Sequence, residues 1–567
     1  MEPATHTHWQ IRESIPDSVS KRLEGFSPII KQMLFNRDCS TIEQAAAYLS
    51  ARLMQSTDPF GLTGMETAVT RLLGAIDAGE TVVIYGDYDV DGVTATALLF
   101  EVVTGLGGKA RPYIPNRYDE GYGLNNEALT LLAQEGAHLV VTVDCGIRSM
   151  KEAAHARSLG IDLIITDHHQ PLEEIPDALA VICPKQPDDT YPEKYLAGVG
   201  LAYKLAQALF TRRPQPGVQA DYWLDLVALG TVADLAPLVG ENRTLVRAGL
   251  ERMRMQTRQG LLSLAGAAGI DLTKVTATDI GFRLGPRLNA AGRLDSALAA
   301  FNLLTTRDLS CAGELAQLLN VQNSERRKQT EETQTKAEAL ALAENPEAML
   351  IFAVSSEFSE GIVGLAASHL ADQYYRPAIV AVQGAETTRG SCRSISEFNI
   401  TAALDECKDL LVRHGGHAAA AGFTVRNENL KELQNRLQEI AVRELDAKRL
   451  QRVLVADIEI PLVDLRPEIL GSLDLLQPTG YGNPEAIFVS RNLSVGRSRT
   501  VGADQQHLKL TVTDGVTFDA IAFKQGRWAG MLPAKIDLMY TFERNDFNGR
   551  TGFQLNVRDL KPSGLPD

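Results

Sequence analysis

Acidic and imidazole side chains follow three short apolar runs in the first third of the chain. They are Asp87, Asp89 and Asp91 in GDYDVDG, Asp144 in VDCG, and Asp167, His168 and His169 in TDHH. In an open parallel sheet the carboxyl ends of the strands border one crevice, where we expect these groups to converge. Carboxylates at this density raise one another's pKa values unless a cation lies among them. Oxygen ligands combined with imidazole suit Mn²⁺ or Mg²⁺, so the pattern predicts a site for divalent cations.

A fourth acid, Asp234, stands within the apolar, helix-like segment WLDLVALGTVADLAPL, residues 223–238. A charge in such a segment costs free energy unless it is paired or bound to a metal. Each acid also has a structural interpretation, because an Asp after a strand commonly caps the next helix, and Asp167 can simply orient a neighbouring histidine. That alternative applies most directly to Asp91 and Asp144. The agreement of four separate segments favours a shared metal site.

The apolar runs that carry these groups are typical of buried strands. The runs are TVVIYGD (81–87), HLVVTVD (138–144), DLIITDHH (162–169) and, further on, ALAVICP (178–184). Val- and Ile-rich runs bounded by turn residues indicate strands that are buried on both faces of a parallel sheet. Because helical segments alternate with them, the sequence predicts a doubly wound α/β domain over residues 76–320.

The rest of the chain divides into four further segments. Residues 1–75 have helical character before the first predicted strand. Residues 321–345 are polar and helix-prone, and we expect them to form a long connecting helix. A second α/β pattern occupies residues 346–450. Residues 451–567 alternate like strands, which favours a small antiparallel barrel of the OB type.

The composition indicates a globular protein of several domains. The chain has 567 residues, of which 44% are hydrophobic and 22% charged, and it is too long for one core. Its start lacks the pattern of a secretory signal, it has no apolar run long enough for a membrane span, and its six cysteines form no CxxC pair. We therefore expect a cytoplasmic protein with reduced thiols. The net charge of −15, from 56 basic and 71 acidic residues, argues against a protein that only coats DNA, but not against an enzyme whose acids bind cations.

Four of these segments, GDYDVDG, VDCG, TDHH and VADLAPL, match the motifs of the DHH phosphoesterases. Further segments resemble one family of that superfamily, the RecJ nucleases. They are PNRYDEGYGL (115–124), GPRLNAAGR (285–293), EFSEGIVGLAAS (357–368), SCRSI (391–395), GGHAAAAGF (415–423) and PTGYGNPEAIF (478–488). Their order and spacing cover nearly the whole chain, and no expected ligand position departs from the family pattern.

The resemblance implies a site for two ions of Mn²⁺ or Mg²⁺, with at least one carboxylate bridging them. The implied metal ligands are Asp89, Asp91, Asp144, His168 and Asp234. Asp87 and His169 would support catalysis, either as further ligands or in contact with the ligands. His169 would serve as a general acid or stabilise charge in the transition state. Such chemistry needs no nucleophilic Ser or Cys.

The resemblance also implies groups that hold the substrate. The implied DNA- and phosphate-binding residues are Arg117, Tyr122, Arg287, Ser391, Arg393, Gly415, Gly416 and His417. Arginine binds phosphate oxygens in a bidentate manner, and small residues let the backbone approach. An ordinary surface salt bridge is the alternative for Arg117 and Arg393, and Arg287 could instead satisfy a helix end. Four aromatic residues of the tail could stack on bases, but we expect most of them in the barrel core: Phe518, Phe523, Trp528 and Phe553.

The implied activity is that of an exonuclease which degrades single-stranded DNA from 5′ to 3′, releases 5′-mononucleotides and acts in DNA recombination and repair. Single-strand-binding protein and a RecQ-type helicase are the implied partners of a monomeric enzyme. Two alternatives remain open: a DHH phosphodiesterase of short oligonucleotides or cyclic dinucleotides, and a non-catalytic DNA-binding replication factor on the same scaffold. The tail disfavours the first, and the intact ligand set disfavours the second. The sequence leaves open the preference between Mn²⁺ and Mg²⁺, the tolerance of RNA and the processivity.

Overall fold

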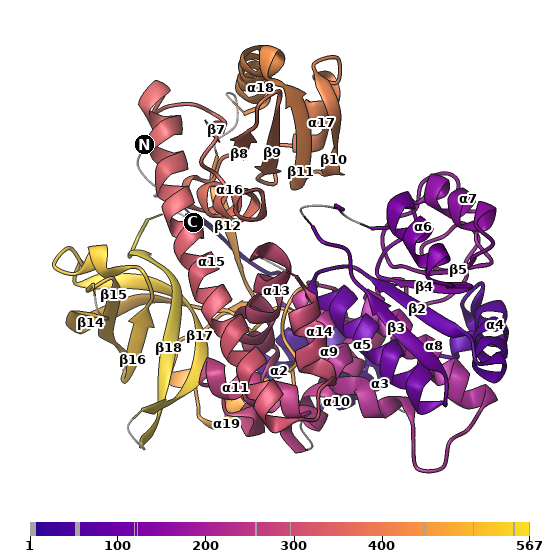
Figure 1. Ribbon diagram of the computed structural model, residues 1–567. Helices are drawn as coiled ribbons and strands as arrows, with labels where there is room; N and C mark the ends of the chain where they lie inside the picture. Colours follow the sequence, from indigo (N-terminus) through magenta and orange to yellow (C-terminus); the bar gives the residue numbers. More distant parts are fainter. Residues whose placement is uncertain are drawn as a thin grey trace. The chain divides into compact units, whose positions relative to one another are not determined.

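The structure, a computed structural model, forms two compact units. It describes residues 7–51, 57–117, 120–121, 123–255, 258–294, 296–445, 450–502, 504–547 and 550–565. The N-terminal unit comprises Ser14–Asn323 and Leu465–Ala486. The C-terminal unit comprises Met1–Glu13, Ser324–Asp464 and Ile487–Asp567. Figure 1 shows both units, with most of their helices and strands labelled.

A five-stranded parallel sheet forms the centre of the N-terminal unit. Its strands are β2 (Thr81–Gly86), β3 (Lys109–Tyr113), β4 (Leu139–Val143), β5 (Asp162–Thr166) and β6 (Ala180–Ile182), in the order β3-β2-β4-β5-β6. The connections leave β2 and β4 in opposite directions, so the switch point at which such sheets bind ligands lies between these two strands. The predicted doubly wound sheet is confirmed. β3 was not predicted, because KARPY at the sheet edge contains no apolar run.

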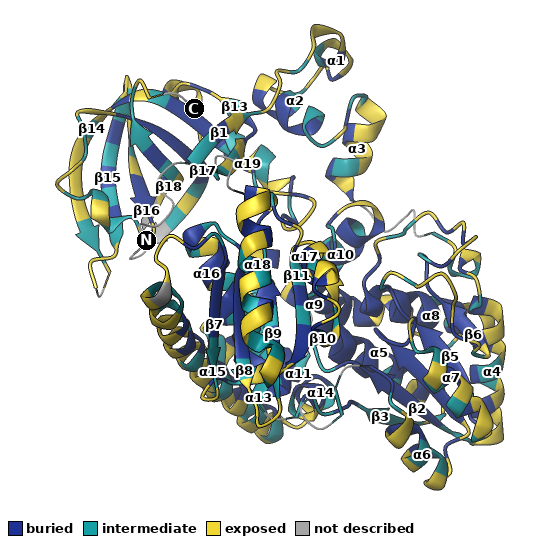
Figure 2. Cartoon of the chain, turned by 90° about the horizontal axis from the view of Figure 1, so that it is seen from above, coloured by how far each residue is buried: buried dark blue, intermediate teal, exposed yellow. Residues whose placement is uncertain are grey.

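Both faces of this sheet are covered, as the apolar runs predicted. Successive residues of a strand face opposite sides of a sheet. Val82 and Ile84 accordingly belong to one apolar core, and Val83 and Tyr85 belong to the other. The first core includes helices α4 (Met65–Ala78), α5 (Val90–Gly105) and α8 (Gly198–Arg212), and the second includes α6 (Asn126–Gln134) and α7 (Met150–Ser158). Figure 2 shows the interior between these strands and helices as buried. Each fully buried Val or Ile side chain stabilises the fold by about 1.5–3 kcal/mol.

Further helices extend the first core beyond the sheet. They are α9 (Leu224–Ala233), α10 (Gly240–Met255), α11 (Gln259–Ala268), α13 (Gly285–Leu294) and α14 (Leu298–Thr305). Every residue of α9 from Leu224 to Val232 is buried, which confirms the helix predicted there. Asp234 is the residue that ends this helix, and it is less deeply buried. The unit also contains the short helices α1 (Asp17–Arg22), α2 (Pro28–Phe35) and α3 (Ile42–Ser50).

One strand occurs where the sequence predicted helices. β1 (Thr7–Ile11) pairs in parallel with β12 (Arg452–Ala456) in the C-terminal unit. The pairing joins residues more than 400 positions apart, so no local pattern could reveal it. The predicted connecting helix is α15 (Leu309–Glu344), a single helix of 36 residues. It begins before the expected residue 321, because the helix-forming stretch LSCAGELAQLLN continues it backwards.

The C-terminal unit contains a second sheet and a barrel. The sheet has the order β10-β11-β9-β8-β7 and consists of β7 (Ile351–Ser355), β8 (Ala378–Gln383), β9 (Thr387–Arg393), β10 (Leu411–His417) and β11 (Ala420–Arg426). Helices α16 (Glu360–Tyr374), α17 (Ile400–Glu406) and α18 (Leu430–Leu445) accompany it. The barrel consists of β14 (Phe488–Val501), β15 (His507–Asp514), β16 (Val516–Ala522), β17 (Lys535–Phe547) and β18 (Arg550–Pro562). It closes because β14 pairs with both β15 and β17, which confirms the predicted OB-like barrel.

All six cysteines are free thiols in the structure, and five of them are buried. Among the helices in the described part of the chain, none is both long enough and apolar enough to cross a bilayer.

Candidate metal centre

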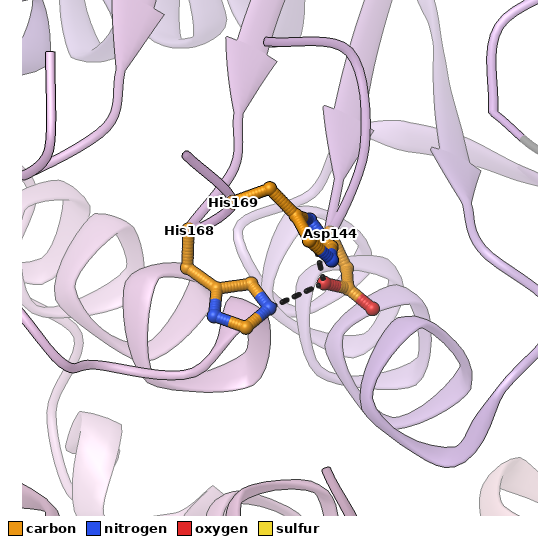
Figure 3. Close-up of side chains that lie close together, drawn as sticks. All are labelled: Asp144, His168 and His169. Carbon is orange, nitrogen blue, oxygen red and sulfur yellow. Dashed lines mark ion pairs between the residues drawn. The ribbon is translucent and has the colours of Figure 1, made fainter. Parts of the chain in front are cut away.

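The predicted carboxylates and imidazoles meet at the carboxyl edge of the parallel sheet, beside its switch point. Three groups each bring ligand atoms within 4.8 Å of one another: Asp87, Asp89 and Asp144; Asp91, His168 and Asp234; and Asp144, His168 and His169. The first two groups are joined, because Asp144 Oδ1 lies 3.0 Å from His168 Nε2. Figure 3 shows both imidazole rings approaching the Asp144 carboxylate. The geometry therefore provides two adjacent cation sites with Asp144 between them.

His168 is suited to bind a metal rather than to act as a counter-ion. Its Nε2 atom lies 3.8 Å from Asp91 Oδ2 and 3.8 Å from Asp234 Oδ2, in addition to the close contact with Asp144. No described residue forms a hydrogen bond with this buried nitrogen, since the 3.0 Å contact lacks hydrogen-bond angles. Burial and the neighbouring His169 lower the pKa of His168 to about 3. The ring is therefore neutral at pH 7 and presents a lone pair to the cluster.

The carboxylates of the cluster require positive charge. Burial, reinforced by the neighbouring acids, raises the pKa of Asp91 to about 7 and the pKa of Asp234 to about 9. Burial also raises the pKa values of Asp87 and Asp144 well above the ordinary range. Asp87 Oδ1 is buried and accepts no hydrogen bond from a described residue. A bound divalent cation would stabilise the ionised form of these carboxylates. The set of oxygen and imidazole donors therefore fits Mn²⁺ or Mg²⁺.

Backbone contacts hold Asp89 and Asp91 in place. Asp89 caps α5, because its Oδ1 accepts a hydrogen bond of 3.0 Å from Gly92 N. Asp91 does not cap α5. Its two oxygens accept hydrogen bonds of 2.6 and 2.8 Å from Gly198 N and Val199 N, the first amides of α8. A carboxylate oxygen has more than one lone pair, so this capping leaves Asp91 able to bind a cation as well.

Asp144 occupies a constrained position. Its backbone has a φ of 63°, which is in the left-handed region, and its amide donates to Thr166 O at 3.0 Å. It caps no helix, because α7 begins only at Met150. A Cβ added to Gly198 would lie 2.6 Å from Asp144 Cβ. The absence of a side chain at Gly198 therefore makes room for Asp144.

Asp167 positions His169 and does not appear in any of the ligand groups. Its Oδ1 accepts from His169 Nδ1 at 2.7 Å, and its Oδ2 accepts from Ile147 N at 2.9 Å. Burial alone would raise the pKa of Asp167, but the hydrogen bond to His169, the charges of both histidines and the Ile147 amide together lower it. Burial likewise would lower the pKa of His169, but Asp167 raises it. The structural role that the sequence offered for Asp167 is thus the one that it has.

Arg117 lies beside the cluster. Its guanidinium stacks on the Tyr88 ring, 4.1 Å from the ring centroid, and no described residue forms a hydrogen bond with its buried Nε. Burial and Asp89 raise the pKa of Asp87, and the positive charge of Arg117 partly offsets this. No described carboxylate forms an ion pair with Arg117, so the alternative of a surface salt bridge is not observed. Tyr122 lies outside the described residues.

The arginines of the GPRLNAAGR region differ in their contacts. Arg283 donates to the carbonyls of Ala268 and Gly269 at 2.7 and 2.8 Å and thus satisfies the end of α11. Arg287 donates from Nε to Asn320 Oδ1 at 3.0 Å and from Nη1 to Arg283 O at 2.7 Å. Both arginines therefore support helix packing. These contacts leave the predicted DNA contact of Arg287 untested.

The predicted residues of the C-terminal unit share one sheet. Ser391 and Gly415 both lie opposite Gly422 of β11, and Arg393 and His417 both lie opposite Ala420. The two rows therefore cross β9, β11 and β10 in register. Arg393 Nη1 donates to Ser391 Oγ at 3.2 Å and to Cys392 O at 2.8 Å. Gly416, between the two rows, has a φ of 151° and no space for a Cβ, which would lie 2.4 Å from Ala420 O.

The expectation that most tail aromatics form the barrel core was wrong. Phe523 is 54% exposed and Phe553 is 37% exposed, while Phe518 and Trp528 are only partly buried. The buried side chains of the barrel strands are others: Leu508, Leu510, Val512, Ala520 and Leu555, together with the aromatic residues Phe488, Tyr540 and Phe542. Strand alternation alone could not say which of the two faces points inward.

Several residues of the site were not found from the sequence. Tyr88 stacks on Arg117, Asn289 Oδ1 accepts from Val90 N at 3.1 Å, and Gly198 accommodates Asp144. Lys185, which follows β6, lowers the pKa values of both Asp234 and His168 through its charge. Asn289 lies in the GPRLNAAGR segment and Tyr88 in the GDYDVDG segment, so the motifs already pointed to these two positions. Gly198 and Lys185 lie in no motif, and nothing in the sequence pointed to them.

Comparison with known proteins places this site in a family. Three family models match successive parts of the chain: the N-terminal domain of the DHH family over residues 81–231, the DHHA1 domain over residues 347–443 and the RecJ OB domain over residues 456–559. The single-stranded-DNA-specific exonuclease RecJ of Bacillus subtilis (strain 168) is 37% identical over 567 residues, covering 99% of this chain and 71% of that protein.

Solved structures agree with this. RecJ from Thermus thermophilus in complex with Mn²⁺ is 31% identical and has a TM-score of 0.85, over 99% of this chain and 80% of the other. The same protein in complex with Mg²⁺ is 29% identical with a TM-score of 0.79, over 99% and 79%. Since sequence and fold agree along the whole chain and the acidic motifs converge as the DHH pattern requires, the chain belongs to the RecJ family of DHH phosphoesterases.

Proposed function

We propose that this protein is a metal-dependent exonuclease specific for single-stranded DNA. The observation that carries the proposal is the pair of adjacent ligand groups joined at Asp144 and His168. Two cations bound by these groups would stabilise the charge of a phosphodiester under attack and would supply hydroxide at neutral pH. Membership of the RecJ family supports the substrate, since its relatives are named for single-stranded DNA.

The ligands divide between the two cations as follows. Asp89 and Asp144, with Asp87, would hold one cation, and Asp91, His168 and Asp234 would hold the other. Asp144 is suited to serve both, because its carboxylate belongs to the first group and contacts His168 of the second. Asp87 is assigned as a direct ligand, because its oxygen lies within 4.8 Å of the ligand atoms of Asp89 and Asp144. This division uses every predicted ligand.

His169 and Arg117 act on the reacting phosphate. The bond from His169 Nδ1 to Asp167 fixes the imidazole tautomer and leaves Nε2 to donate or accept a proton at the scissile group. The raised pKa of His169 favours a protonated ring, which suits a general acid. Arg117 has no carboxylate partner among the described residues and offers its guanidinium to a phosphate.

The remaining predicted residues are assigned to the DNA strand. Ser391, Arg393, Gly415, Gly416 and His417 form two aligned rows and are proposed, with Arg117, Tyr122 and Arg287, to contact phosphates. The exposed aromatic side chains of the barrel are proposed to stack on bases. Degradation from 5′ to 3′ with release of 5′-mononucleotides follows the family assignment. By resemblance to the family we also propose roles in recombination and repair, a cytoplasmic monomer, and single-strand-binding protein and a RecQ-type helicase as partners.

Digestion of end-labelled oligonucleotides tests the proposal. With Mn²⁺, a 3′-labelled single strand should shorten stepwise from its 5′ end, a 5′-labelled strand should release labelled mononucleotide at once, and a duplex should resist. EDTA should stop the reaction. A strand whose 5′ end is blocked should resist if polarity is 5′ to 3′. Equal cleavage of dinucleotides and long strands would instead identify a phosphodiesterase of short oligonucleotides, and no cleavage with either metal would contradict the proposal.

A further inference from the structure

A polar cavity of about 310 Å³ lies in the N-terminal unit at the ends of α5 and α9 that are remote from the metal centre. Glu101 lines it from α5, ten residues after Asp91, and Asp225 lines it from α9, nine residues before Asp234. At 1.5 Å per helical residue, both helices separate the cavity from the metal centre by about 14–15 Å. The cavity is therefore a different site from the metal centre.

The acids of this cavity already have partners. Arg258 Nη1 donates to Glu101 Oε1 at 2.6 Å, and Arg258 Nε donates to Asp225 Oδ2 at 3.2 Å. The other oxygen of Glu101 accepts from Trp223 Nε1 at 2.6 Å. Burial would lower the pKa of Arg258, but the two carboxylates raise it, so the ion pair is fully charged. These three lining groups contact one another and hold the helices together.

Two more arginines line the cavity, Arg252 and Arg307, and neither has a hydrogen bond or ion pair with a described residue. The Nε atom of Arg252 is nevertheless buried, and its guanidinium lies over the Tyr222 ring, 4.3 Å from the centroid. The other three arginines of α10 differ from Arg252 because each donates a hydrogen bond to a backbone carbonyl. Arg243 donates to Leu475 and Gln477, Arg247 to Leu49, and Arg254 to Val275.

We propose that this cavity binds a small phosphate monoester, no larger than a mononucleotide. The cavity volume is at the lower end of the range of about 300–1,000 Å³ for small-ligand pockets. Both lining carboxylates contact Arg258, so Arg252 and Arg307 are the lining cations without an ion pair to a described residue. A phosphate monoester carries a charge of about −1.5 to −2 at pH 7 and has several acceptor oxygens, so one ligand satisfies both guanidiniums.

Calorimetric titration of the full-length protein in EDTA tests this proposal, with deoxyadenosine 5′-monophosphate and inorganic phosphate as separate probes. We expect the nucleotide to bind at least as tightly as inorganic phosphate. Two charge-assisted contacts predict that Arg252→Gln with Arg307→Gln weakens binding about a hundredfold. Arg307→Gln alone, at an exposed residue without a described partner, should weaken binding about tenfold with an unchanged melting temperature.

The control removes the same charge elsewhere. Arg157→Gln with Arg436→Gln breaks only exposed ion pairs, to Asp177 and to Asp409 and Glu432, and should leave binding unchanged. Absence of nucleotide binding by the wild-type protein would overturn the proposal. So would equal binding by the cavity variant and the control, which would place the nucleotide elsewhere, or binding of inorganic phosphate alone. Cleavage of single strands is measured separately and should be the same in all variants, so the cavity proposal and the nuclease proposal can fail independently.

Discussion

Replacement of Gly198 by alanine should damage the metal centre without unfolding the protein. The new Cβ would lie 2.6 Å from Asp144 Cβ and 3.0 Å from both Asp144 Cγ and Oδ1. Ordinary carbon–carbon contacts are about 3.5–4.0 Å, so Asp144 or the start of α8 must move by about 1 Å. The same residue donates its amide to Asp91 Oδ2, so a shift of α8 also displaces Asp91. One methyl group thus disturbs both cation sites.

The expected size of the effect follows from this displacement. A misplacement of about 1 Å at a reacting centre costs about 10²-fold in rate. Gly198 is the first residue of α8, so alanine at this position leaves the hydrogen bonds within the helix intact. We therefore expect Gly198→Ala to lower the cleavage rate about 10²-fold and to weaken Mn²⁺ binding, while the melting temperature changes little.

Gly200 provides a matched control on the same helix. A Cβ at Gly200 would approach only Leu196, with its closest atoms at 3.4 Å, and no cluster residue. Cleavage of a labelled single strand is measured across a Mn²⁺ titration for wild type, Gly198→Ala and Gly200→Ala, and each melting curve is recorded. Gly200→Ala should behave as wild type. If Gly198→Ala cleaves DNA as fast as Gly200→Ala at every Mn²⁺ concentration, Asp144 and Asp91 do not depend on this close approach, and the reasoning fails.

Further predictions concern the ligands and their protonation. Asp144→Ala should abolish cleavage and leave the circular dichroism spectrum unchanged, because Asp144 belongs to two of the three ligand groups; near-normal turnover would remove its bridging role. Asp167→Asn should lower the pKa of His169, so the alkaline limb of the pH–rate profile should move to lower pH, and an unmoved limb would show that His169 does not act as an acid. Burial raises the pKa of Asp91 to about 7 and that of Asp234 to about 9, from about 3.9 when unfolded, so the metal-free protein should lose stability as pH rises from about 5 to 9. Melting curves with EDTA should show this loss, and Mn²⁺ should restore the melting temperature most strongly at the high end of that range.

The parts of the structure that the sequence predicted are those with a local signal. The strands β2, β4, β5 and β6 are apolar runs, and their acids follow them directly, so strand and ligand were found together. β1 and β3 lack such runs and exist because distant strands pair with them. The metal-binding role of Asp91 was predicted from its motif, but its hydrogen bonds to the start of α8 were not. That helix begins 107 residues later in the chain. Roles that depend on packing between distant segments could not be predicted either. Gly198 is an example, because its role is to leave space for Asp144.

The electrostatics of Asp91 show why the fold alone does not complete this centre. Asp91 receives two amide hydrogen bonds at the N-terminus of α8, where the helix dipole favours negative charge. Those bonds lower its pKa, yet burial and the Asp89 charge outweigh them and leave it at about 7. Burial raises the pKa of Asp234 to about 9, and it also raises the pKa values of Asp87 and Asp144 well above that of an ordinary aspartate. Since His168 is neutral and Arg117 offsets only part of the charge at Asp87, the protein does not supply enough positive charge to ionise four buried acids at neutral pH. Divalent cations supply it, and each must displace protons as it binds, which makes metal affinity rise with pH.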